Sequence, residues 1–321
     1  MSKRYIFAID LGGTGTKMAI LDVEGNFVEQ WEIPTDLSEK GVHIVANIAK
    51  SFHHKLEEKN LSKEDFLGVG MGAPGPAVEG GVISRAVNLG WENYPLKDEL
   101  EKHLGLTAFV DNDANCAAQG ELWKGAGKGY RDMIFITLGT GVGGGIIANG
   151  DIIEGTNGAG GEIGHMTVQL EGGYTCNCGK CGCLETVTSA TGVVRLAMEH
   201  LKEENHSVRL EEIYHKNGKI TSKDVFDLAK DGDEGALSIV DQVGRYLGYA
   251  IGTLATVFNP KAVVIGGGVS KAGKTLLEPV EKYYREYAFP PSVNDTTLLL
   301  ATLGNDAGVI GGGYLVKKNL G

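Results

Sequence analysis

An internal repeat constrains the fold of this chain more than any other feature. Residues 5–27 and 133–153 each predict an apolar strand, a bend rich in glycine and threonine, a second apolar strand and a turn. Residues 107–122 and 298–315 also resemble each other, and both contain the tripeptide Asn-Asp-Ala. Because the two pairs occur in the same order, the sequence predicts a duplicated fold with two related halves.

The segments between the repeats predict an α/β architecture. Helical patterns cover three segments, residues 39–60, 222–259 and 274–287, and the second should end at Asn259–Pro260. Apolar runs at 66–76 and 261–270 predict buried parallel strands that end in glycine loops. A chain of 321 residues with 42% hydrophobic side chains suits two α/β halves that face each other across a cleft.

Charge and composition narrow the class of partner. Thirty basic and 41 acidic side chains give a net charge of −11, which repels nucleic acids and anionic membrane surfaces. The apolar run near the N-terminus is too short for a signal peptide, and no run approaches the roughly 18 apolar residues of a membrane span. We therefore expect a cytoplasmic protein with reduced cysteines and with neither a nucleic-acid nor a membrane partner.

Each repeat contains a glycine-rich bend, and the pair predicts phosphate binding. Glycines let backbone N–H groups approach a phosphate closely, although either bend alone could be an ordinary hairpin turn. Hydroxyl groups, one lysine and a carboxylate suited to a magnesium-bound water accompany the bends. The expected contacts to phosphate and magnesium are Asp10, Gly12, Gly13, Thr14, Gly15, Thr16, Lys17, Thr140 and Gly141, and in a duplicated fold Gly266, Gly267 and Gly268 would border the adenine and ribose of a nucleotide.

Two other nucleotide-binding motifs match by spacing. Residues 139–144 fit the dinucleotide pattern G-x-G-x-x-G, but the following residues predict a strand where that motif requires a helix. Residues 268–275 fit the P-loop pattern between a predicted strand and a predicted helix. Only 46 residues follow Thr275, which is too few for the usual remainder of such a domain. This argues against a P-loop protein, which is kept only as an alternative.

Four of the five cysteines, at positions 176, 178, 181 and 183, lie in the segment CNCGKCGC, shortly after His165. Clustered thiolates and an imidazole in a reducing compartment predict a tetrahedral Zn²⁺ site. Either all four cysteines bind the metal, or His165 and three cysteines do. A closed site of either kind is structural, since catalytic zinc keeps an open position. Cys116 is expected to be a buried residue of a helix.

Acidic residues at two places suggest an acid–base function. Asp113 follows a predicted strand and precedes an alanine-rich segment, so it can cap a helix or act as a general base toward a hydroxyl group. The helix can be capped while Asp113 acts as the base if Asp111 or Asn112 is the capping residue. Glu162 and Glu185 bracket the cysteine cluster and, although each alone could be a surface carboxylate, together they suit a polyhydroxylated ligand.

Four ordered motifs, DLGGTGTK (10–17), LGTGVGGG (138–145), EIGH (162–165) and CNCGKCGCLE (176–185), resemble the ROK family over the whole chain. The stretches MGAPGP (71–76), VNLGW (87–91) and GGGVS (266–270) are similar to its bacterial ATP-dependent glucokinases in particular. The resemblance implies a duplicated actin-like fold of the hexokinase and ribonuclease H type. We expect domains at 1–120 and 121–321, with the last helix, about 305–321, returning to the first.

The resemblance also implies an activity and the residues that perform it. It implies transfer of the γ-phosphoryl group of MgATP to the 6-hydroxyl of glucose, with Asp113 as the base and a homodimer as the assembly. The implied sugar contacts are Gly75, Asn88, Asn112, Asp113, Glu162, His165 and Glu185. The implied zinc ligands are His165, Cys176, Cys178 and Cys183, so that Cys181 is an extra thiol beside the site.

Two alternatives to a glucokinase remain at this point. A kinase of mannose, fructose, N-acetylglucosamine or N-acetylmannosamine would share the same residues. A sugar-responsive regulator of the same family would carry a DNA-binding domain before the first glycine bend, where only nine residues precede Asp10.

Overall fold

The computed structural model describes residues 4–321, which form two compact units. Of these residues, the first unit comprises 4–129, Ile152–Gly160 and Asn305–Gly321, and the second comprises Tyr130–Asp151 and Gly161–Gly304. No helix within residues 4–321 is both long enough and apolar enough to cross a membrane.

The first unit is built on a five-stranded sheet with the order β3-β2-β1-β4-β8. Its strands are β1 (Tyr5–Leu11), β2 (Gly15–Asp22), β3 (Phe27–Pro34), β4 (Phe66–Ala73) and β8 (Ala108–Asn112). A three-stranded sheet adds β5 (Ala77–Val78), β6 (Val82–Ala86) and β7 (Trp91–Tyr94). The helices of this unit are α1 (Ile44–Lys59), α2 (Leu96–Leu104), α3 (Asp113–Lys124) and α11 (Ala307–Leu320).

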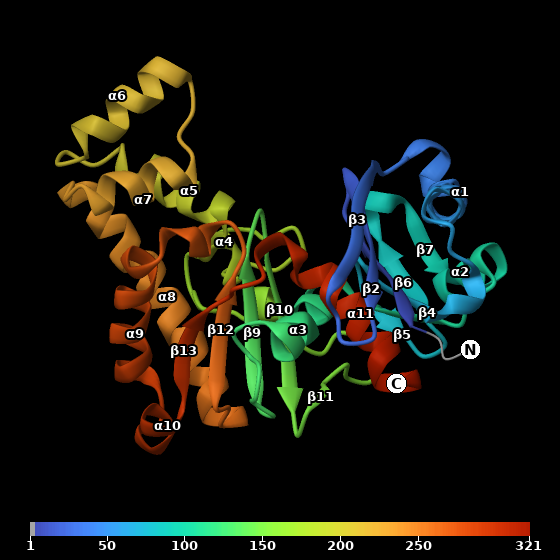
Figure 1. The fold of residues 1–321 in the computed structure, drawn as a ribbon. Helices are drawn as coiled ribbons and strands as arrows, with labels where there is room; N and C mark the ends of the chain where they lie inside the picture. The colour runs from blue at the N-terminus through green and yellow to red at the C-terminus, as the bar shows by residue number, and fades with distance from the viewer. Residues whose placement is uncertain (1–3) are drawn as a thin grey trace. The chain divides into compact units, whose positions relative to one another are not determined.

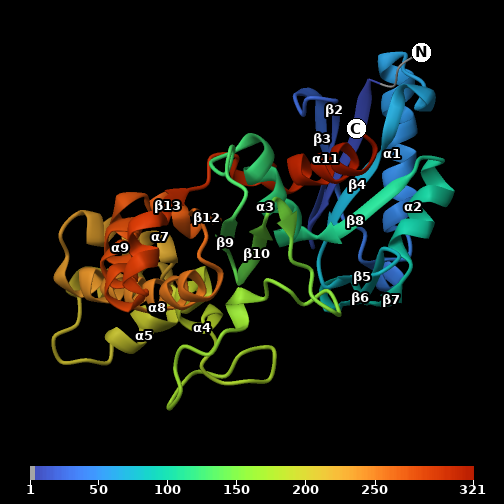
Figure 2. The same cartoon turned by 90° about the horizontal axis from the view of Figure 1, so that it is seen from below.

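Alternation along β1 places helices on both faces of this sheet. Phe7 and Ile9 pack into a core with residues of α1 and α2, whereas Ile6 and Ala8 pack against Val309 and other residues of α11. Successive side chains of a strand point to opposite faces, so a fully apolar strand must be covered twice. Figures 1 and 2 show α1 and α2 on one side of the sheet and α11 on the other.

The second unit repeats the topology with the order β11-β10-β9-β12-β13. Its strands are β9 (Met133–Leu138), β10 (Val142–Ala148), β11 (Asp151–Ile152), β12 (Ala262–Gly266) and β13 (Thr297–Leu300). Its helices are α4 (Glu185–Thr188), α5 (Ala190–His200), α6 (Val208–Asn217), α7 (Ser222–Lys230), α8 (Glu234–Phe258), α9 (Lys274–Tyr287) and α10 (Pro290–Asp295). Helices α8 and α9 lie beside β12 and β13 (Figure 1).

The strand pairing confirms the predicted duplication. In each sheet an antiparallel hairpin, β1–β2 or β9–β10, contains the glycine bend, and its first strand also pairs in parallel with β4 or β12. The apolar runs at 66–76 and 261–270 are the parallel strands β4 and β12, as predicted.

The predicted helices are right in type but not always in extent. The pattern at 274–287 is α9, whereas the one at 39–60 begins as a helix only at Ile44. The pattern at 222–259 is wrong as a single helix, because the chain turns at Gly232 with φ +87° and Asp233 caps α8 through the Ala236 amide. That helix ends with Asn259 in the left-handed conformation, as predicted.

Candidate active site

The first glycine bend joins β1 to β2 as a tight turn. The amide of Gly12 donates to the carbonyl of Gly15 at 2.9 Å, and a Cβ atom at position 12 would meet that oxygen at 2.8 Å. A Cβ atom at Gly13 would meet nothing within 4 Å, so the outer side of the bend is open. This bend therefore offers backbone groups to a ligand with no side chain in front of them.

Two side chains predicted for this bend are engaged elsewhere. Thr16 is buried, with 1% of its surface exposed, and its hydroxyl lies 3.0 Å from the Thr35 hydroxyl. It supports the bend from behind and does not line the open side. The Lys17 ammonium donates to the carbonyl of Asn305 at 2.9 Å, which ties the bend to the segment before α11.

Asp10 lies near the end of β1, paired with Lys17 on β2. Its carboxylate is covered by α11, because a Cβ atom at Gly308 would come within 2.5 Å of Oδ2. Burial raises the pKa of Asp10 to about 6, with a further contribution from the charge of Asp113. A carboxylate kept from water at the edge of an open glycine bend suits a cation accompanied by phosphate.

Asn112 and Asp113 stand where β8 passes into α3. Asn112 is the N-cap, because its Oδ1 accepts from the amides of Ala114 and Asn115 at 2.9 and 3.2 Å. Its Nδ2 donates to the carbonyl of Gly75 at 3.1 Å, so two of the predicted sugar contacts lie together. Asp113 is the first residue of α3, and the capping role belongs to its neighbour.

Glycine at position 75 is required by the backbone. Gly75 has φ +92°, and a Cβ atom there would meet the carbonyl of Arg85 at 2.2 Å. Asn88, the other predicted contact of this unit, lies exposed in the short 3₁₀ helix Val87–Leu89.

Asp111 is a functional candidate that the sequence suggested only as a cap. Its carboxylate is 4% exposed and accepts from the Asn112 amide, the Asn115 Nδ2 and the Gln119 Nε2 at 2.7 to 2.9 Å. Burial raises its pKa to about 6 against the opposing effect of these donors. Asp111 therefore fixes the turn that carries Asn112 and Asp113. Asn115 and Gln119 lie four residues apart on one face of α3, and Asp111 lies four residues before Asn115, so the spacing of the three polar residues was a signal in the sequence.

The second glycine bend, residues 139–141 in the second unit, is packed against a carboxylate. The amide of Gly139 donates to the carbonyl of Gly141 at 2.9 Å. Glu185 Oε2 accepts from the Val142 amide at 3.0 Å, and a Cβ atom at Gly141 would lie 2.3 Å from the same oxygen. A residue predicted to bind sugar is thus held by the bend predicted to bind phosphate.

His165 and Glu185 lie beside the cysteine cluster, and Glu162 lies beside His165. His165 Nδ1 is 3.6 Å from Cys176 Sγ, while its Nε2 is 3.9 Å from Glu162 Oε2. Glu185 Oε1 lies 3.8 Å from the same sulfur. The imidazole therefore has one nitrogen directed to the cluster and the other directed to a carboxylate.

The cluster has the donors and the size of a zinc site. One ligand atom from each of His165, Cys176, Cys178 and Cys183 lies within 4.8 Å of all the others. Cys176 Sγ lies 3.6 Å from His165 Nδ1, and Cys178 Sγ lies 3.6 Å from Cys183 Sγ, the latter close to the ~3.8 Å expected between two sulfurs of a zinc tetrahedron. Cys181 stays outside the group, with its sulfur 3.8 Å from the Thr175 hydroxyl. Three thiols and an imidazole fit Zn²⁺.

The glycines after β12 also lie against the second bend. Gly267 has φ +83°, and a Cβ atom there would meet the backbone of Leu138 at 2.5 Å. Residues 139–144 continue into β10 with no helix, which confirms the rejection of the dinucleotide motif. In the P-loop match, residues Val269–Ala272 are a 3₁₀ helix, and within residues 4–321 a single strand of the sheet, β13, follows it.

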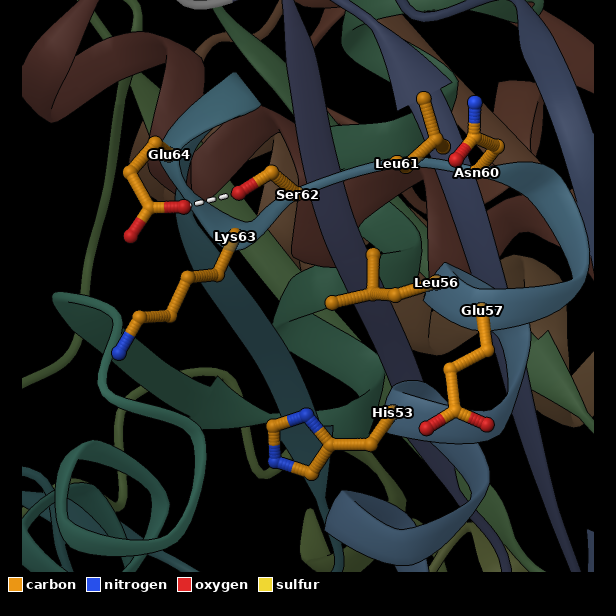
Figure 3. A pocket seen from close by; sticks show the side chains of 8 residues that line it. All are labelled: His53, Leu56, Glu57, Asn60, Leu61, Ser62, Lys63 and Glu64. Atoms are coloured by element: carbon orange, nitrogen blue, oxygen red, sulfur yellow. Dashed lines mark hydrogen bonds between the residues drawn. The ribbon is translucent and has the colours of Figure 1, made fainter.

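A surface hollow of about 560 Å³ in the first unit contains none of these residues. It is lined by His53, Leu56, Glu57, Asn60, Leu61, Ser62, Lys63 and Glu64 (Figure 3). The Ser62 hydroxyl donates to Glu64 at its rim.

The sequence profile of the ROK family matches residues 6–319. The chain belongs to the ROK family. Among ROK relatives, a glucokinase of Halalkalibacterium halodurans is 53% identical over 99% of this chain and 96% of its own. A glucokinase of Thermotoga maritima is 35% identical over the full length of both chains.

Solved structures of ROK proteins share the fold. A ROK family glucokinase from Streptomyces griseus, in complex with glucose and AMPPNP, has a TM-score of 0.80 and 32% identity over 98% of this chain and 100% of that one. A ROK family transcriptional regulator, homologous to the E. coli MLC protein, has a TM-score of 0.86 and 26% identity over 98% of this chain and 78% of that one. The duplicated α/β, actin-like fold expected from the resemblance to ROK proteins is thereby confirmed.

Proposed function

We propose that this chain is an ATP-dependent glucokinase, which transfers the γ-phosphoryl group of MgATP to the 6-hydroxyl of glucose and releases glucose 6-phosphate and ADP. The observation that carries the proposal is the 53% identity to the Halalkalibacterium halodurans glucokinase over nearly the whole of both chains. The Streptomyces griseus glucokinase, solved with glucose and a nucleotide analogue, supports the same substrates.

The proposed sugar contacts form two sets. Asp113 accepts the proton of the 6-hydroxyl as general base, while Asn112, Gly75 and Asn88 belong to the same unit. With both lone pairs of Oδ1 and one Nδ2 hydrogen used internally, Asn112 retains one N–H for a sugar hydroxyl. From the second unit we propose Glu162 and Glu185, whose carboxylates accept hydrogen bonds from hydroxyl groups, and His165, which offers a ring nitrogen.

The two glycine bends are the proposed phosphate sites. Phosphoryl transfer depends on alignment and on neutralisation of charge, so backbone amides carry much of the task. From the first bend we propose Gly12, Gly13, Thr14, Gly15 and Lys17, and from the second Thr140 and Gly141; Gly266, Gly267 and Gly268 border the nucleoside. Asp10 would hold the magnesium of MgATP through water, and the bound cation supplies positive charge to the phosphates. Thr16 is left out of the phosphate contacts because its hydroxyl meets Thr35.

A structural Zn²⁺ bound by His165, Cys176, Cys178 and Cys183 is part of the proposal. Bound zinc would hold the segment that carries His165 and Glu185 in one conformation. The Lys180 ammonium donates to the carbonyl of His165 at 2.8 Å and closes the same segment. The thiols and the use of ATP suit the cytoplasm, and we propose a homodimer, which sedimentation equilibrium tests directly.

The function is tested by ADP release from MgATP with glucose, mannose, fructose, N-acetylglucosamine and N-acetylmannosamine. We expect glucose to give the highest kcat/KM. Asp113→Ala should abolish turnover, whereas Asp227→Ala, on the exposed face of α7, should not. Preference for an N-acetyl sugar would change the substrate and keep the site. Glucose binding without turnover of the wild type would mean a sensor, the role suggested by the structural likeness to a ROK regulator.

A further inference from the structure

The carbonyl oxygens of the second glycine bend are all tied back into the protein. Gly139 O accepts from the Ala190 amide at 2.8 Å, and Thr140 O accepts from the Thr191 hydroxyl at 3.0 Å. Gly141 O accepts from the Gly139 amide within the bend. Thr191 lies in the first turn of α5, 51 residues from Thr140 in sequence.

In the first bend another segment holds two carbonyl oxygens, those of Gly12 and Thr14. Gly12 O accepts from the Thr35 hydroxyl at 2.7 Å, and Thr14 O accepts from the Thr35 amide at 3.1 Å. Thr35 directly follows β3 and is 23 residues from Gly12 in sequence. The buried Thr16 hydroxyl donates to Thr35, since the single Thr35 proton goes to Gly12 O.

The N–H groups behave in the opposite way. Within residues 4–321, no hydrogen bond is donated by the amides of Gly13 and Thr14 in the first bend or of Thr140 and Gly141 in the second. The Gly13 amide shares its peptide group with the held carbonyl of Gly12. The amides of Thr140 and Gly141 share theirs with the held carbonyls of Gly139 and Thr140, so these three N–H groups point away from the held side. Such a set of outward amides is a site for anionic oxygens.

We propose that Thr35 and Thr191 are positioning residues, one for each phosphate bend. Each hydroxyl holds a carbonyl oxygen of its bend, so that the neighbouring amides face the phosphates of MgATP. This inference rests on the proposed function and goes beyond it, because neither threonine lies in a glycine motif or belongs to the proposed ligand contacts. Preorganised amides need no rearrangement when the nucleotide binds. Loss of the hydrogen bond from the threonine hydroxyl to the bend carbonyl should therefore weaken nucleotide binding.

The test compares Thr35→Val and Thr191→Val with the wild type in steady-state kinetics and in calorimetric titration with AMPPNP. Valine keeps the shape of threonine and removes the hydroxyl. We expect each variant to raise KM for MgATP and Kd for AMPPNP by roughly 3- to 10-fold, the effect of one lost hydrogen bond. KM for glucose should stay within about twofold, and Thr35→Ser and Thr191→Ser should restore wild-type values.

A matched control removes a hydroxyl that does not touch either bend. Thr253 on α8 donates to the carbonyl of Tyr249 in its own helix at 3.0 Å, and Thr253→Val should leave both KM values unchanged. The double variant Thr35→Val/Thr191→Val should multiply the single effects, because the two bends belong to different units and share no hydrogen-bond partner.

The possible outcomes are distinguishable. A selective rise in KM for MgATP that serine reverses supports the proposal. Unchanged nucleotide affinity in both valine variants of an active kinase would overturn it and leave the glucokinase function intact. Equal rises in both KM values would also overturn it, since they indicate general damage. If Thr35→Val fails to fold, Thr191→Val and the AMPPNP titration decide alone, whereas a wild type without glucose-dependent turnover refutes the proposed function instead.

Discussion

Replacing Gly141 by alanine should damage glucose binding, although Gly141 belongs to the proposed nucleotide site. A Cβ atom there would lie 2.3 Å from Glu185 Oε2, more than 1 Å closer than the ordinary contact of about 3.4 Å or longer. The carboxylate cannot simply swing aside at no cost, because the same oxygen accepts from the Val142 amide at 3.0 Å. The methyl group therefore moves Glu185 from the position in which it would meet the sugar.

The size of the effect follows from the bond that is lost. A hydrogen bond to a charged group contributes about 1.5–3 kcal/mol, and each 1.4 kcal/mol corresponds to a factor of ten in affinity. We expect Kd for glucose to rise about 10- to 100-fold. Calorimetric titration with glucose in the absence of nucleotide measures this directly, so that any change at the phosphate bend does not enter the result.

Gly139→Ala is the matched control in the same bend. The nearest atom to a Cβ atom at Gly139 is the carbonyl oxygen of Gly141, at 4.0 Å, so the methyl group enters open space and Glu185 keeps its place. Glucose affinity should be unchanged in this variant. Equal glucose affinity in Gly141→Ala and the wild type would refute either the steric argument or the role of Glu185 as a sugar contact.

The remaining predictions concern the base, its support and the metal. Asp113→Asn should lower kcat by about 10²- to 10⁴-fold with glucose Kd nearly unchanged, and undiminished turnover in single-turnover experiments would rule out a general base at this position. Asp111 has its pKa raised from 3.8 to about 6 by burial, so its contribution to stability is fully present below pH 3.8 and is lost as pH rises through 6. Measured by urea unfolding, the free energy of unfolding of the wild type should therefore fall by about 3 kcal/mol relative to that of Asp111→Asn between pH 3.8 and 6. If the difference between the two proteins is constant or increases with pH, the carboxylate is not buried as described. Cys178→Ser should reduce the zinc content of the purified protein, whereas Cys181→Ser should retain one zinc ion per chain. Elemental mass spectrometry measures the zinc content, and an equal loss in both variants would place Cys181 in the site.

Much of the fold could be predicted because its signals are local. A strand, a glycine bend and a second strand are encoded within about 20 residues, and finding the pattern twice indicated the two sheets with the same strand order. The break between α7 and α8 was missed because the apolar period continues on both sides of Gly232, and one left-handed residue followed by a capping aspartate was enough to divide it.

The orientation of Thr16 is encoded in the periodicity of its strand. Thr16, Met18 and Ile20 share one face of β2, and Met18 and Ile20 are fully buried in the core of the first unit. The two-residue period of a strand therefore predicts an inward hydroxyl at position 16. Thr35 and Thr191 gave no such signal, since each acts on a carbonyl far away in sequence, and a backbone contact of this kind imposes no motif.

The two halves hold their phosphate bends by the same chemistry but by different connections. In the first half the chain passes from β3 directly to Thr35, which returns to the bend, and α1 follows at Ile44. In the second half, residues 161–189 precede α5 and contain Glu162, His165, the cysteine cluster and Glu185 before Ala190 reaches the bend. The segment that would recognise the sugar is thus followed directly by residues that contact the bend that would bind phosphate. Glu185, a proposed sugar contact, also accepts a hydrogen bond from Val142 beside that bend. Because these contacts are carried by one short stretch of chain, ordering of this segment by zinc or sugar should also order the second phosphate bend, which the first half achieves with Thr35 alone.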